Sequence, residues 1–153
     1  MLRRALPVLA VLLSLLFACA LGGCGGDDSL SASQLHTQAS AICTRTAAAT
    51  DRVALPAAPA QSGLFLQQGL AHLRPAAARL RALKAPQDLR KRYDRAAQLA
   101  GQEVALIARS EQALARGDDP ADTFRQLATA LQPLTTEENA YWRGLGIDAC
   151  VRR

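Results

Sequence analysis

Aromatic residues are scarce in this chain of 153 residues, since Phe, Trp and Tyr together make up only 4% of the sequence. Strands favour aromatic and β-branched side chains, whereas alanine, which is abundant here, favours helices. After the first 23 residues, no stretch shows the alternation of apolar and polar side chains that is typical of a half-buried strand. These absences argue against a sheet and predict an all-α protein.

Metal ligands are equally few. His36 and His72 are the only histidines, and they fall on different predicted helices with no Cys-x-x-Cys or Glu-x-x-His motif. Glu103 and Glu111 share a helix, but neither is followed by a histidine three residues later, as a di-iron bundle site requires. We therefore expect no metal and no cofactor, and we expect both histidines to face solvent or lie near helix caps.

Motifs for catalysis are also missing, because the chain has no Gly-x-Ser-x-Gly, no Ser-x-x-Lys and no glycine-rich loop after a strand. The carboxylate pairs Asp118-Asp119 and Glu137-Glu138 are explained by helix N-termini, which favour negative charge. We predict no catalytic residue and a non-enzymatic protein.

The N-terminus has a distinct pattern. Arg3 and Arg4 precede an apolar run over residues 5–21, which ends in Leu21-Gly22-Gly23-Cys24. Basic residues ahead of such a run stay cytoplasmic, and the run is short for a membrane span, which needs roughly 20 residues. The segment resembles a bacterial lipoprotein signal peptide. The resemblance implies cleavage before Cys24, a diacylglycerol and a palmitate-type acyl chain on the mature N-terminus, and export of the remaining chain.

Other processing routes are weighed against this one. Cys19 is a rival lipidation site, but bulky Phe17 near the cleavage point disfavours it. An ordinary secretory peptide and an uncleaved anchor are the remaining alternatives. We favour a lipoprotein signal peptide over residues 1–23, a flexible tether over 24–30 and a helical domain over 31–153, at the extracytoplasmic face of the cell membrane.

Four helices are predicted after the tether, each with apolar residues at three-four spacing. The first begins at Ser31 or Ser33 with a capping box that uses Gln34. The others run from about residue 62 to 84, from about 87 to 116 with Gly117 as the expected stop, and from 120 to about 146. Pro75 and Pro133 should kink or split their helices, and Thr135-Thr136-Glu137-Glu138 predicts a capping box for a fresh helix start after Pro133. Short links predict an antiparallel up-down-up-down four-helix bundle with kinked helices.

The cysteines predict one disulfide. Cys19 leaves with the signal and Cys24 carries lipid, so Cys43 and Cys150 remain as a pair in an oxidising compartment. In the predicted bundle the tail after Gly144 can run back along the first helix over roughly 20 Å, which is enough to reach Cys43. Two buried free thiols are the alternative.

A basic cluster spans the second and third predicted helices and comprises Arg74, Arg79, Arg81, Lys84, Arg90, Lys91, Arg92 and Arg95. One interpretation is a solvated helical face whose side-chain stems cover apolar surface. The other is an anionic-surface patch for lipid headgroups, wall polymers or an acidic partner, formed by Arg79, Arg81, Lys84, Arg90, Lys91, Arg92 and Arg95. The solvated face is the simpler interpretation.

Three short segments carry a family resemblance: Ala41-Ile42-Cys43, residues 83–89 with Tyr93, and residues 145–150. Together they resemble small, functionally uncharacterised helical lipoproteins of actinobacteria. Removal of Arg3 and Arg4 lowers the formal charge from +5 to +3, too mild a charge to indicate nucleic-acid binding.

The favoured function is a membrane-anchored protein-interaction or envelope-assembly module. Its partners would be the membrane, through the lipid on Cys24, and an envelope protein. The alternative is a carrier that binds a small molecule or lipid between its helices.

Overall fold

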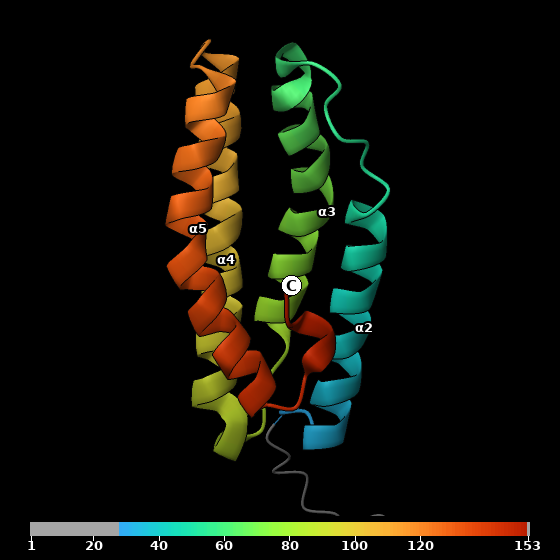
Figure 1. Cartoon of the computed structure of the whole chain (residues 1–153). Helices are drawn as coiled ribbons and strands as arrows, with labels where there is room; N and C mark the ends of the chain where they lie inside the picture. Colours follow the sequence, from blue (N-terminus) through green and yellow to red (C-terminus); the bar gives the residue numbers. More distant parts are fainter. Residues whose placement is uncertain (1–27, 153) are drawn as a thin grey trace, which may run out of the picture.

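Four α-helices dominate the computed structural model, which describes residues 28–152. They pack against one another, and no strand occurs within the described range, which confirms the predicted all-α bundle (Figure 1). The predicted signal peptide and most of the predicted tether lie outside this range. The elements are α2 (Ala32–Thr50), η1 (Pro59–Gln61), α3 (Ser62–Ala82), α4 (Gln87–Ala115), α5 (Pro120–Gly144) and η2 (Asp148–Cys150).

The helix ends follow from local capping chemistry. Ser31 caps α2: its hydroxyl accepts from the Gln34 amide at 3.2 Å, and the Gln34 side chain accepts from the Ser31 amide at 2.9 Å. Asp119 caps α5 by accepting from the amide of Asp122 at 2.9 Å. Gly117 follows α4 with a φ of 95°, a left-handed conformation that a side chain disfavours. These predicted boundaries are confirmed.

Two prolines lie inside helices, yet neither helix is split. α3 continues through Pro75, and α5 continues through Pro133. The fresh helix start expected near Thr135 is wrong, since the Thr136 hydroxyl donates to the carbonyl of Gln132 within the same helix at 2.9 Å. A proline removes one backbone hydrogen bond, and packing along a long helix can offset that loss.

The core is small and centres on two aromatic rings. Tyr93 and Trp142 are fully buried and meet edge to face, with ring centroids 5.8 Å apart. The Tyr93 hydroxyl donates to the carbonyl of Leu80 at 2.7 Å, and burial raises the pKa of this phenol well above its usual range. Ala128, which the three-four pattern of α5 predicts to face inward, is exposed. Small side chains let α3 and α4 approach closely, namely Ala76, Ala77, Ala96, Ala97 and Ala100.

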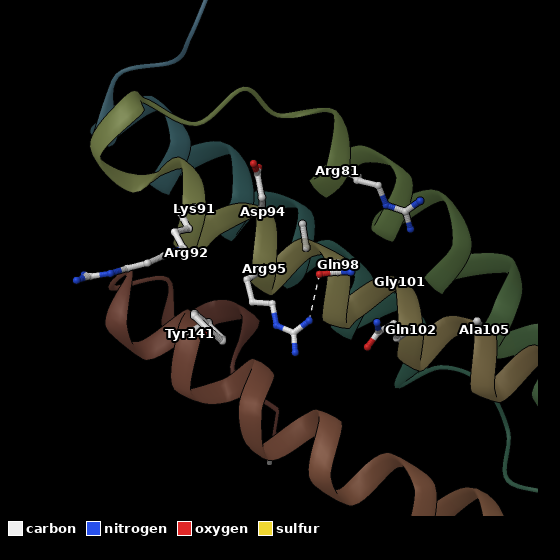
Figure 2. A pocket seen from close by; sticks show the side chains of 11 residues that line it. Arg81, Lys91, Arg92, Asp94, Arg95, Gln98, Gly101, Gln102, Ala105 and Tyr141 are labelled. Carbon is white, nitrogen blue, oxygen red and sulfur yellow. Dashed lines mark hydrogen bonds between the residues drawn. The ribbon is translucent and has the colours of Figure 1, made fainter.

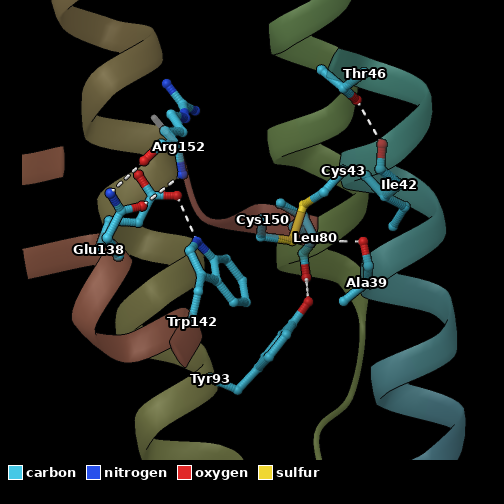
Figure 3. The surroundings of a disulfide bond; sticks show 11 residues. Ala39, Ile42, Cys43, Thr46, Leu80, Tyr93, Glu138, Trp142, Cys150 and Arg152 are labelled. Atoms are coloured by element: carbon cyan, nitrogen blue, oxygen red, sulfur yellow. Dashed lines mark hydrogen bonds between the residues drawn. A yellow bond between two sulfur atoms is a disulfide. The ribbon is translucent and has the colours of Figure 1, made fainter. Parts of the chain in front are cut away.

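The C-terminal tail folds back onto α2. A disulfide joins Cys43 to Cys150, whose Cα atoms are 5.1 Å apart, as predicted (Figure 3). Gly146 turns the chain with a φ of 69°, and His36 donates from Nε2 to the Gly146 carbonyl at 2.7 Å. Ile147 is buried beneath this turn. The tail therefore fastens α2 to the C-terminal end of α5.

The chain enters the bundle beside the connection between α3 and α4. The amide of Leu30 donates to the carbonyl of Lys84 at 2.8 Å, and the Lys84 ammonium pairs with Asp28 at 3.3 Å. We call this the tether end of the bundle; it is the lower end in Figure 1. No helix in the described part of the chain has the length and apolarity needed to cross a membrane.

Removing the disulfide should destabilise the fold. Because the bond closes a loop of about a hundred residues, replacing both Cys43 and Cys150 by alanine should lower the free energy of unfolding by about 2–5 kcal/mol. Urea denaturation of the oxidised protein and of the double variant measures this. Equal midpoints and slopes for the two proteins would contradict the expectation.

Candidate functional site

An open groove of about 1210 Å³ runs over the outer side of α4. Its walls come from Arg81 of α3, from α4 residues between Lys91 and Ala105, and from Tyr141 of α5 (Figure 2). We call this the basic groove, because its charged side chains are Arg81, Lys91, Arg92 and Arg95 with the single acid Asp94.

A glycine shapes the groove. A Cβ atom added at Gly101 would overlap the guanidinium of Arg81, and the nearest other atoms belong to the same side chain. The missing side chain therefore lets the Arg81 guanidinium lie against the α4 backbone (Figure 2).

The cations of the groove differ in their partners. Arg95 donates from Nε and Nη2 to Glu137 at 2.9 and 2.7 Å, and from Nη1 to Gln98 at 3.1 Å. The bond to Glu137 is the main cause that raises the pKa of Arg95. Arg81, Lys91 and Arg92 form no ion pair with any acidic side chain of residues 28–152. These three cations are available to an anionic ligand.

The rest of the predicted patch is dispersed. Lys84 pairs with Asp28 at the tether end. Arg90 donates from Nε to the carbonyl of Ala85 at 3.4 Å and makes a further interaction. Arg79 is exposed on α3 but does not line the groove. The fold thus gathers Arg81, Lys91, Arg92 and Arg95 from the predicted patch.

A second hollow, of about 690 Å³, lies between α2, α3, α4 and the C-terminal tail. Ile42, Leu73 and Leu80 contribute apolar walls, while Glu138 and Arg152 contribute charge. We call it the interhelical cleft. Its volume is in the range of small-molecule sites.

Two carboxyl groups are buried behind this cleft. Glu103 of α4 is 0% exposed and Glu138 of α5 is 2% exposed. Glu103 accepts from the Thr135 hydroxyl at 2.5 Å and pairs with Arg152. Glu138 accepts from Trp142 Nε1 at 2.7 Å (Figure 3). Asn139 holds the backbone of Arg152 through two hydrogen bonds, at 2.8 and 2.9 Å.

Burial raises the pKa of Glu138 to about 7. The charge of Arg152 lowers it, and the charge of Glu103 raises it. Glu138 Oε2 makes no hydrogen bond with the described residues, so it is the oxygen that is free to carry a proton. A protonated Glu138 leaves one negative and one positive charge in the cluster.

The sequence analysis missed this cluster. The interpretation of Glu137-Glu138 as helix N-terminal charge is wrong for both: Glu138 is buried inside α5, and Glu137 pairs with Arg95. The sequence does contain a pattern from which the burial of Glu138 could be predicted. One stripe of α5 at three-four spacing consists of Leu127, Leu131, Leu134, Glu138 and Trp142. A carboxylate on an apolar stripe indicates a buried acid with a partner.

The histidines lie apart from these hollows, with both His36 and His72 exposed. Across residues 28–152, no group of three or more His, Cys, Asp or Glu side chains is placed to hold a metal ion.

The chain matches no family model, no curated protein and no solved structure at a significant level. The resemblance to actinobacterial helical lipoproteins stays a prediction.

The buried pair should make stability depend on pH. The pKa of Glu138 is about 7 in the fold, against an ordinary value of 4.5. The contribution of Glu138 to the free energy of unfolding is therefore complete below about pH 4.5 and is lost as pH rises through 7. Glu138→Gln, which mimics the protonated form, should remove this loss, worth up to about 3 kcal/mol, and raise stability at pH 8. Urea unfolding at pH 5.5 and pH 8 measures both effects.

The matched control is Glu137→Gln. Glu137 is the half-buried neighbour that pairs with Arg95, so this variant should keep the wild-type pH dependence. The same pH dependence in wild type and Glu138→Gln would contradict a titrating Glu138.

Proposed function

We propose that the protein is a lipid-anchored, extracytoplasmic and non-enzymatic module that presents its basic groove to an acidic component of the cell envelope. The observation that carries this proposal is the exposure of Arg81, Lys91 and Arg92 in one groove with no acidic partner in the described chain. Arginine binds carboxylate and phosphate groups in a bidentate manner, which suits it to such a surface.

Cysteine pairing supports the anchor. Cys43 and Cys150 are joined to each other, so Cys24 is the one cysteine after residue 23 that stays available for lipid. The tether is short, and Leu30 packs against the core, so a lipid on Cys24 would hold the bundle close to the membrane. A lipoprotein carries at least two acyl chains, and two chains suffice for stable anchoring.

The proposal includes an up-down-up-down course with bends at Pro75 and Pro133. Short connections support it, since only residues 83–86 separate α3 from α4 and only 116–119 separate α4 from α5. Contact between His36 near the start of α2 and Gly146 just after α5 also supports it. This course brings the tether and the basic cluster to one end.

Replacement of the lipidated cysteine tests the anchor. In cells, Cys24→Ser should move the protein from the membrane to the soluble extracytoplasmic fraction or leave the precursor uncleaved, because the thiol that carries lipid is gone. Fractionation and intact-mass analysis measure this. Cys19→Ser is the matched control and should leave the mature mass unchanged. An unmodified N-terminus elsewhere than Cys24 would overturn the anchor.

A carrier is the second candidate function, and the interhelical cleft favours it. The cleft measures about 690 Å³ and has apolar walls. The described residues expose only two large apolar side chains strongly, Leu55 and Leu64, which gives an apolar protein partner little surface. An apolar small molecule would occupy the cleft between α2 and α3.

Filling the cleft tests the carrier. The uncharged apolar fluorophore N-phenyl-1-naphthylamine should bind the wild-type protein with enhanced emission. Thr46→Trp places a large ring in the cleft and should abolish this enhancement. Thr37→Trp places the same ring on the exposed side of α2 and should leave it unchanged. Equal emission from both variants would contradict binding in the cleft.

A further inference from the structure

The basic groove begins at the tether end of the bundle. Leu30 and Asp28 both contact Lys84, which lies between α3 and α4. Arg81 belongs to the last turn of α3, and Arg92 lies only about 8 Å along α4 from its first residue. The groove cations therefore stand beside the point where the chain enters the bundle.

The tether is too short to move this end far from a membrane. Asp28 follows Cys24 by four residues, and four extended residues span at most about 14 Å. The electrostatic screening length at physiological salt is about 8 Å. A lipid on Cys24 would thus keep Asp28, and the tether end that it contacts, within about two screening lengths of the lipid headgroups.

Charge is unevenly distributed along the bundle. Residues 79–95, at the tether end, hold seven basic side chains and two acidic ones. The connection between α4 and α5 lies at the far end, about 43 Å along α4, and is mostly acidic. There Asp118 pairs with Arg116 and Asp122 pairs with Arg125, while Asp119 caps α5. An anionic surface attracts the first end and repels the second.

We infer that Arg81, Lys91 and Arg92 dock on the anionic phospholipid headgroups of the same leaflet that holds the Cys24 lipid. This inference rests on the proposed function and names its acidic component. The phosphate groups of the lipids match the guanidinium forks of Arg81 and Arg92. Tyr141 adds an aromatic ring with a polar tip, which suits the membrane interface. Docking orients the anchored bundle, since a second attachment acts at high effective concentration.

Lysine acetylation can measure this contact at defined positions, because Lys84 and Lys91 are the only lysines in the chain. The acylated full-length mature protein is inserted into vesicles of phosphatidylcholine alone, or of phosphatidylcholine with phosphatidylglycerol. Both lysines are then acetylated, and the rate of acetylation at each lysine is measured by mass analysis of its peptide. Phosphatidylglycerol should slow acetylation of Lys91 by about fivefold, and added salt should restore the rate.

Two variants sharpen the test. Arg116→Lys introduces a reference lysine at the far end of α4, and its acetylation should not depend on the lipid. The double variant Arg81→Gln, Arg92→Gln should lose the protection of Lys91. The matched control, Arg45→Gln with Arg109→Gln, removes two exposed charges outside the groove and should keep it. Circular dichroism checks that all variants stay helical.

The outcomes separate the inference from the proposed function. Protein that does not float with the vesicles overturns the anchor, and with it the proposed function. Protein that floats but shows equal Lys91 acetylation on both vesicles overturns headgroup docking alone. Equal protection by soluble polyphosphate without phosphatidylglycerol overturns the lipid as the partner. Salt-sensitive protection that requires phosphatidylglycerol, Arg81 and Arg92 supports the inference.

Discussion

The C-terminal tail is the element on which the arrangement of helices depends. α2 packs mainly on α3 and on η2, and the disulfide between Cys43 and Cys150 fixes it there. Two residues later, Arg152 pairs with Glu103 of α4, while Asn139 of α5 holds its backbone. The same short tail therefore contacts α2, α4 and α5. A bundle with few aromatic residues gains from such a clamp, because the covalent bond restricts the unfolded chain.

The buried acids Glu103 and Glu138 favour one placement of the C-terminal tail over others, although they add little net stability. Taking a carboxylate and a guanidinium out of water costs about as much as their attraction returns, so the pair with Arg152 adds little net stability. Removing one partner, however, leaves a buried unpaired charge and costs several kcal/mol. An alternative register of the tail would also separate Arg152 from Glu103 and Asn139. We hypothesise that the cluster selects one placement of residues 150–152.

Local chemistry could be predicted from the sequence, whereas long-range charge pairing could not. The capping box at Ser31 and the stop at Gly117 depend on neighbouring residues only, and both were predicted. The disulfide followed from cysteine counting and chain reach. Glu138 was misassigned because its partners, Glu103 and Arg152, come from other parts of the chain. The basic cluster was visible in the sequence, but its division between groove and open surface depends on helix phase and on Gly101.

The small overall charge of the chain after the predicted signal peptide, +3, does not measure the electric field at the tether end. The field near a surface depends on where charges lie within a screening length. Glu103 compensates Arg152 inside the bundle, and Glu137 compensates Arg95, so these pairs contribute little outside. Arg81, Lys91 and Arg92 have no acidic partner among residues 28–152, while several aspartates follow the end of α4, about 35 Å along the helix from Arg92. Segregation of charge, rather than its total, is what allows a mildly basic bundle to present a cationic surface.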